Sequence, residues 1–82
     1  MPTPIEIQAA AHTAVAELIG RKVADDESLI SSGVIDSLSI LRLITSLEGK
    51  LSMRLSLDKV QPDDFDSVDL IAETVLRVGV ER

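Results

Sequence analysis

The sequence has no cysteine, tryptophan or tyrosine, and only one phenylalanine and one histidine. Without cysteine, neither a disulfide framework nor a thiolate metal site can form. A zinc site would need ligands that are almost all carboxylates, which zinc sites rarely use. The commonest general bases and nucleophile pairs of enzymes are missing as well. We therefore predict a protein that is not an enzyme, with no catalytic residues and no bound metal.

Long apolar runs and basic charge are also scarce. No apolar run approaches the roughly 18 residues of a membrane span, and the amino terminus has no basic region followed by an apolar segment. Basic residues number 8 against 14 acidic ones, which gives a formal charge of −6. This charge disfavours nucleic acid and anionic membranes as partners and favours basic protein surfaces. We expect a cytoplasmic monomer without membrane insertion.

Aliphatic residues are abundant, and apolar residues make up 45% of the 82. A chain of this length forms one domain, here residues 1–82, and buries only roughly 60–65% of its unfolded surface. An aliphatic core almost without aromatic rings suits packed helices better than a β-sandwich.

Three segments show the apolar spacing of amphipathic helices: Ile5–Ile19, Ser37–Gly49 and Val68–Val78. Thr3 can cap the first helix, with Pro4 at its first position. Each predicted helix ends at a glycine. The expected core stripes are Ile7, Ala11, Ala14, Val15 and Leu18; Ile40, Leu43, Ile44, Leu47 and Leu51; and Val68, Ile71, Ala72, Val75 and Val78.

The segments between the helices are unequal. Arg21–Asp36 is a long connector, anchored by Leu29 and Ile30, and its length hints at function. Leu51–Gln61 alternates apolar and polar residues like a strand, but no other segment is expected to pair with it, so we predict an extended loop. Gln61–Phe65 suits one short turn of helix, with Phe65 pointing inward. The predicted fold is an all-α, small four-helix bundle: three main helices, one short helix and a long first loop.

The acidic runs and the histidine carry little chemistry. Asp25–Glu27 and the pair Asp63-Asp64 have no apolar shielding to raise a pKa, so solvated loop charge is the preferred interpretation. Asp58–Asp66 shares some spacing with a calcium-binding EF-hand loop but lacks the central glycine and terminal glutamate. His12 lies off the apolar stripe of its helix, and we interpret it as an ordinary surface residue.

Ser37 is the one residue whose surroundings suggest a site. It follows Asp36 at the boundary between the long connector and the second helix. Free backbone N–H groups and the helix dipole favour an anion there, so its primary hydroxyl could hold one. The same position is equally suited to a plain helix cap, made by Asp36 or Ser37.

The whole pattern resembles the acyl and peptidyl carrier proteins. The resemblance rests on an apolar pair in a long first loop, an amphipathic helix after the serine, a short third helix and a closing helix. At its centre is the run Gly33-Val34-Ile35-Asp36-Ser37-Leu38. In that family the serine of Asp-Ser-Leu is esterified with 4′-phosphopantetheine taken from coenzyme A. The resemblance therefore implies a discrete carrier that holds an acyl or aminoacyl group as a thioester on Ser37.

The resemblance also implies partners and further site residues. A phosphopantetheinyl transferase would modify Ser37, and Asp36 would cap the helix and help that enzyme bind magnesium. A loading ligase and a downstream transferase would then dock on the second helix. The implied partner contacts are Leu38, Leu41 and Arg42, together with Phe65 and Val60 where the chain borders the arm.

One feature departs from part of the family. Fatty-acid-synthesis carriers have several acids along the second helix, whereas this chain has Arg42 at a central position and only Glu48 further on. The chain therefore looks closer to aminoacyl or peptidyl carriers, including D-alanyl carrier proteins, and to stand-alone carriers of specialised pathways. The alternative is a non-catalytic interaction module in which Ser37 is only a helix cap. The sequence does not encode the cargo.

Overall fold

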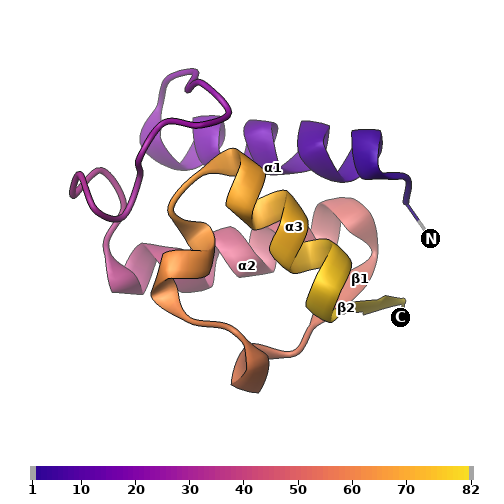
Figure 1. Cartoon of the computed structure of the whole chain (residues 1–82). Coiled ribbons are helices and arrows are strands. Elements are labelled where there is room, and N and C mark those ends of the chain that lie inside the picture. Colours follow the sequence, from indigo (N-terminus) through magenta and orange to yellow (C-terminus); the bar gives the residue numbers. More distant parts are fainter. Residues whose placement is uncertain (1, 82) are drawn as a thin grey trace.

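The structure is a computed structural model and describes residues 2–81. Three α-helices pack around a shared aliphatic core, and the carboxyl-terminal residues pair with the segment that follows the second helix (Figure 1). In chain order the elements are α1 (Pro4–Ile19), α2 (Ser37–Leu51), β1 (Met53–Leu55), the short 3₁₀ turns η1 (Leu57–Lys59) and η2 (Pro62–Phe65), α3 (Val68–Val78) and β2 (Gly79–Glu81).

Helix α1 begins and ends as its sequence predicts. The Thr3 hydroxyl accepts a hydrogen bond from the Glu6 N–H at 3.2 Å, and the Glu6 carboxylate accepts one from the Thr3 N–H at 3.3 Å. This reciprocal pair satisfies two of the backbone donors left free at a helix start. Gly20 ends the helix in the left-handed region, with φ of 80°, and donates its N–H to the Ala16 carbonyl.

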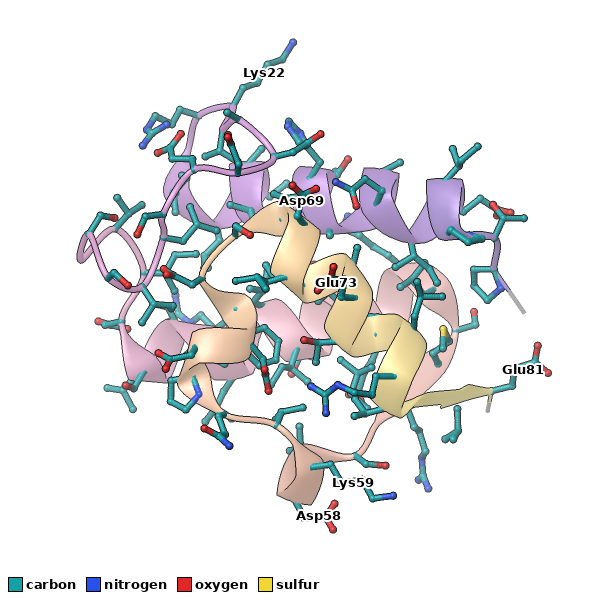
Figure 2. All side chains as sticks on the ribbon, in the orientation of Figure 1. Lys22, Asp58, Lys59, Asp69, Glu73 and Glu81 are labelled. Atoms are coloured by element: carbon teal, nitrogen blue, oxygen red, sulfur yellow. The ribbon has the colours of Figure 1, made fainter. Side chains whose placement is uncertain are left out.

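The core is formed where α1 packs against both α2 and α3. The long connector crosses one end of the bundle in Figure 1 and contributes buried side chains of its own. At the start of α3, the Gln8 amide on α1 donates to the Asp69 carboxylate at 2.8 Å, and Figure 2 shows Asp69 beside α1. The predicted helical stripes lie against this core, and the connector adds Val23, Leu29 and Ile35.

The predicted loop after α2 is wrong at its first residues. Met53–Leu55 forms strand β1, which pairs antiparallel with Gly79–Glu81, with Arg54 opposite Val80. The partner was missed because β2 is short and follows α3 directly. Glu48 supports the ribbon, since its carboxylate accepts the Leu55 N–H at 2.9 Å.

Two boundaries also differ from the prediction. Helix α2 continues past Gly49 to Leu51, because Leu51 is buried and extends the apolar stripe by one turn, and Ser52 then ends it with φ of 52°. The short third helix is the 3₁₀ turn η2, with Phe65 buried as predicted, and η1 is an additional turn before it. The all-α prediction, three main helices and a short one, is confirmed.

Candidate functional site

Ser37 is the first residue of α2 and is exposed to solvent. The cap before it is Asp36, whose Oδ1 accepts the Ser39 N–H at 2.8 Å. Hydrogen bonds from the Ser39 N–H and hydroxyl hold the pKa of the Asp36 carboxyl below its usual range. Ser37 is therefore not the helix cap, although the interaction-module hypothesis required it to be one. Its hydroxyl is presented at the helix start.

The connector reaches this position through a tight turn. Gly33 has φ of 82°, a left-handed conformation that glycine adopts without strain, and its N–H donates to the Ile30 carbonyl at 3.0 Å. Leu29 and Ile35 are almost completely buried on either side of this turn. The predicted anchor at Leu29 is confirmed, and the connector is packed against the bundle.

An apolar groove of about 170 Å³ opens beside Ser37. It runs between α2 and the segment that contains η1 and η2, which lies alongside α2 in Figure 1. Such a groove could hold the apolar part of a flexible group attached to Ser37. Both residues predicted to border the arm, Val60 and Phe65, contribute to it. The full lining is Ser37, Ile40, Leu41, Ile44, Leu57, Val60, Gln61, Pro62 and Phe65.

The outer face of α2 carries the predicted partner-contact residues. Leu38 is 79% exposed and Leu41 is 56% exposed, whereas Leu47, on the buried stripe of the same helix, is inaccessible. Arg42 is exposed next to Leu41. Two further aliphatic residues are exposed and were not predicted as site residues: Val34, three residues before Ser37, and Leu57, which lines the groove. Leu57 belongs to the apolar and polar alternation of Leu51–Gln61, and this alternation was the sequence signal that could have identified it.

Asp66 is the site residue that sequence reasoning missed. From the sequence we considered it as the last residue of the run Asp58–Asp66. The cap of α3 is made by the next residue, Ser67, whose hydroxyl accepts the Leu70 N–H at 3.1 Å. The Asp66 carboxylate instead accepts hydrogen bonds from the connector. Those from the Ser31 N–H and hydroxyl and from the Ile30 N–H are the main reason why its pKa falls to about 2.

The other acidic residues and the histidine lie outside the groove. His12 Nε2 is 3.6 Å from the Asp25 carboxylate, and the two line a separate shallow hollow on α1. Asp64 accepts the Gln61 N–H at 2.8 Å and pairs with Arg77 at 3.3 Å. Among residues 2–81, no group of acidic and histidine side chains is arranged to hold a metal ion. Within the same residues, no helix is long and apolar enough to cross a membrane.

Comparison with known proteins supports a carrier. Residues 10–75 match the family described as phosphopantetheine attachment site, a stretch that includes Ser37, the groove and most of each helix. The chain belongs to this phosphopantetheine-carrier family. Its members carry covalently attached 4′-phosphopantetheine, so the function expected from the resemblance, holding a group on that arm, is confirmed.

Individual relatives agree with the family match. The chain is 32% identical to the D-alanyl carrier protein of Streptococcus sanguinis (strain SK36) over 73 residues, which are 87% of this chain and 92% of the relative. It is 30% identical, with the same coverage, to the D-alanyl carrier proteins of Streptococcus gordonii (strain Challis) and Streptococcus thermophilus (strain LMD-9). These relatives agree with the expectation from the sequence that the chain is closer to aminoacyl carriers than to fatty-acid-synthesis carriers.

The geometry around Ser37 fits the family's prosthetic group. An attached phosphodiester would lie at the start of α2, where free N–H groups and the helix dipole favour an anion by about 0.3–1 kcal/mol. The groove beside Ser37 offers the chain of the arm an apolar surface. When bound, the group supplies a terminal thiol that holds cargo as a thioester.

Proposed function

We propose that Ser37 is the attachment residue and that its hydroxyl forms the phosphodiester with 4′-phosphopantetheine from coenzyme A. The observation that carries the proposal is the exposed Ser37 hydroxyl at the first position of α2, at the mouth of the apolar groove. Nearby hydroxyls are engaged elsewhere: Ser31 donates to Asp66 at 2.8 Å, and Ser32 donates to the Ser28 carbonyl at 2.7 Å.

Asp36 has two roles in this proposal. It caps α2, which holds the first turn in place around Ser37. Its carboxylate is charged at neutral pH, as that of an ordinary aspartate is, so it can also help the transferase bind magnesium.

The proposed cargo is a small aminoacyl group, D-alanine being the first candidate. The relatives named above are D-alanyl carrier proteins. The groove of about 170 Å³ beside Ser37 offers an apolar surface to the arm and to a small group at its end.

We further propose that the outer face of α2 is the docking surface for the partner enzymes. A carrier must meet a phosphopantetheinyl transferase, a loading ligase and a downstream transferase in turn. Leu38 and Leu41 offer apolar contact, and Arg42 offers a positive charge. Glu48, the one acid expected on this helix, is half-buried and bound to the Leu55 N–H. Partners of this carrier would therefore recognise an apolar and cationic face.

Residues 1–82 act as one carrier domain, monomeric and cytoplasmic, with no catalysis of its own. The partner enzymes perform the chemistry, and this chain contributes a reactive hydroxyl, a groove and a docking face.

The test is modification by coenzyme A and a promiscuous phosphopantetheinyl transferase, followed by intact-mass measurement. We expect the wild type to gain the mass of one arm and Ser37→Ala to gain none. Ser39→Ala is the matched control, since it removes the nearest other hydroxyl on the same helix, and it should still gain one arm. Absence of a mass gain on the wild type, or a gain on Ser37→Ala, would contradict the proposal.

A further inference from the structure

The Asp66 carboxylate is the centre of a hydrogen-bond network with the connector. Its Oδ1 accepts three consecutive backbone N–H groups, those of Leu29 at 3.1 Å, Ile30 at 2.7 Å and Ser31 at 2.9 Å. The same oxygen accepts the Ser28 hydroxyl at 3.2 Å, and Oδ2 accepts the Ser31 hydroxyl at 2.8 Å. One side chain therefore fixes the turn of the connector that precedes α2.

The network continues towards Ser37 through Leu29. The Leu29 N–H also donates to the Asp66 backbone carbonyl at 2.7 Å, and the Leu29 carbonyl accepts the Ile35 N–H at 2.9 Å. Ile35 is buried and lies two residues before Ser37. A continuous series of hydrogen bonds thus runs from Asp66 through Leu29 to the backbone that enters α2.

Asp66 is also adjacent in the chain to the segment that forms one wall of the groove. It directly follows η2, whose Pro62 and Phe65 line the groove beside Ser37. Phe65 is buried in the core, which gives this segment a rigid base. The carboxylate therefore links the wall of the groove to the connector, and Ser37 lies where these two segments meet α2.

We propose that Asp66 is a positioning residue for the modification of Ser37: it holds the connector and the groove wall in the arrangement that presents the hydroxyl to the transferase. This inference rests on the proposed function of Ser37. Asp66 does not touch the reacting atoms, and its effect passes through the backbone of Leu29 and Ile35. Reaction rates are sensitive to such placement, because a misplacement of about 1 Å can cost roughly a hundredfold in rate.

The experiment compares three variants with the wild type. Asp66→Ala removes every hydrogen bond to the carboxylate, whereas Asp66→Asn keeps the acceptor oxygen and loses the charge. Asp63→Ala is the matched control, since Asp63 is an exposed acid of η2, three residues earlier in the same segment. For each protein we would measure amide hydrogen exchange, the unfolding transition, and kcat and KM for arm transfer from coenzyme A.

We expect Asp66→Ala to speed amide exchange at Leu29, Ile30 and Ser31 and also at Ile35, by at least about tenfold. Its kcat/KM for arm transfer should fall by about tenfold or more, beyond any loss of folded protein seen in the unfolding transition. Asp66→Asn should give a smaller change, and Asp63→Ala should behave like the wild type. If Asp66→Ala does not fold, Asp66→Asn supplies the same comparison.

The inference is overturned if Asp66→Ala, or Asp66→Asn in its place, matches Asp63→Ala both in exchange at Ile35 and in kcat/KM. It is also overturned if only residues 29–31 lose protection while Ser37 reacts at the wild-type rate, because the role of Asp66 would then be local. Failure of the wild type to accept an arm would instead contradict the proposed function. In that case the exchange at Ile35 still decides whether Asp66 fixes the entry to α2.

Discussion

Asp36 and Ser37 are adjacent at the start of α2 and have different roles. Asp36 accepts the Ser39 N–H and so stabilises the first turn. Ser37, one position further, has an exposed side chain and no capping role. Because the cap does not depend on Ser37, its hydroxyl can be modified without loss of the structure that presents it.

The Asp66 carboxyl should make the stability of the fold depend on pH. Its pKa is about 2 in the folded protein, against about 3.9 for an unperturbed aspartate. The carboxylate therefore contributes stability above about pH 4, and this contribution is lost as the pH falls through about 2. We expect the urea midpoint of the wild type to exceed that of Asp66→Asn at pH 7, and the difference to shrink as the pH approaches 2. A difference that does not depend on pH would contradict this explanation.

At the scale of the elements, α2 has two apolar flanks with different uses. One flank, with Leu47 at its centre, is buried against the bundle, and the other exposes Leu38 and Leu41. The β1–β2 ribbon then ties the segment after α2 to the end of α3. The helix is thus held from its buried flank and its carboxyl end, which leaves the outer face available.

The two flanks should respond differently to truncation. Leu38→Ala should change the free energy of unfolding by no more than about 0.5 kcal/mol, yet lower kcat/KM with a phosphopantetheinyl transferase by about tenfold, equivalent to about 1.4 kcal/mol. Leu47→Ala should lower the free energy of unfolding by about 2–5 kcal/mol, because it leaves a cavity. Denaturant titrations and arm-transfer kinetics measure both effects.

Leu76→Ala is the control for these truncations, because Leu76 is an exposed leucine on α3 (47%), away from α2. It should leave both stability and transfer kinetics nearly unchanged. Equal kinetic losses in Leu38→Ala and Leu76→Ala would show that the outer face of α2 has no special role in docking.

The β1–β2 ribbon is closely packed around Gly79. A Cβ atom on Gly79 would lie 2.5 Å from both the Met53 side chain and the Val75 carbonyl oxygen. Met53 can move, but the backbone oxygen cannot move without disturbing α3. Gly79→Ala should therefore lower the free energy of unfolding by about 1–3 kcal/mol.

Gly49→Ala is the matched control, since a Cβ there meets no atom within 4 Å and the residue is exposed within α2. Alanine should raise the free energy of unfolding by about 0.5–1 kcal/mol at that position. Thermal or urea unfolding of the two variants distinguishes them by sign. A stabilising Gly79→Ala would mean that the ribbon is not packed as described.

At the scale of the whole molecule, the charge of −6 is unevenly placed. Figure 2 shows Asp69 and Glu73 on α3, and Asp58 projecting from η1 together with Lys59. On α2, by contrast, the exposed face combines leucines with Arg42. The exposed face of α2 therefore differs in character from the net charge of the chain, and this difference is the basis of the proposed apolar and cationic docking face.

Most of the fold could be predicted because its signals are local. Thr3, Pro4 and Gly20 mark the ends of α1, and helical spacing marks the buried stripes. The Asp36-Ser37 pair was visible for the same reason, since a cap and its helix are neighbours in sequence.

The features that escaped prediction depend on distant partners. Strand β1 forms only by pairing with Gly79–Glu81, which follows α3 in the sequence. That segment is too short to show an apolar alternation of its own. Asp66 bonds to residues that precede it by 35–38 positions. Neither pairing has a local signature, and the groove beside Ser37 exists only once η2 packs on α2.

The location of the arm after transfer from coenzyme A tests most directly whether Ser37 is the attachment residue. Trypsin should release residues 23–42, which contain Ser37 together with Ser28, Ser31, Ser32 and Ser39. Tandem mass spectrometry of that peptide identifies which hydroxyl carries the phosphopantetheine. We predict modification on Ser37 alone. An arm on any other serine, or none on this peptide, would show that Ser37 is not the attachment residue.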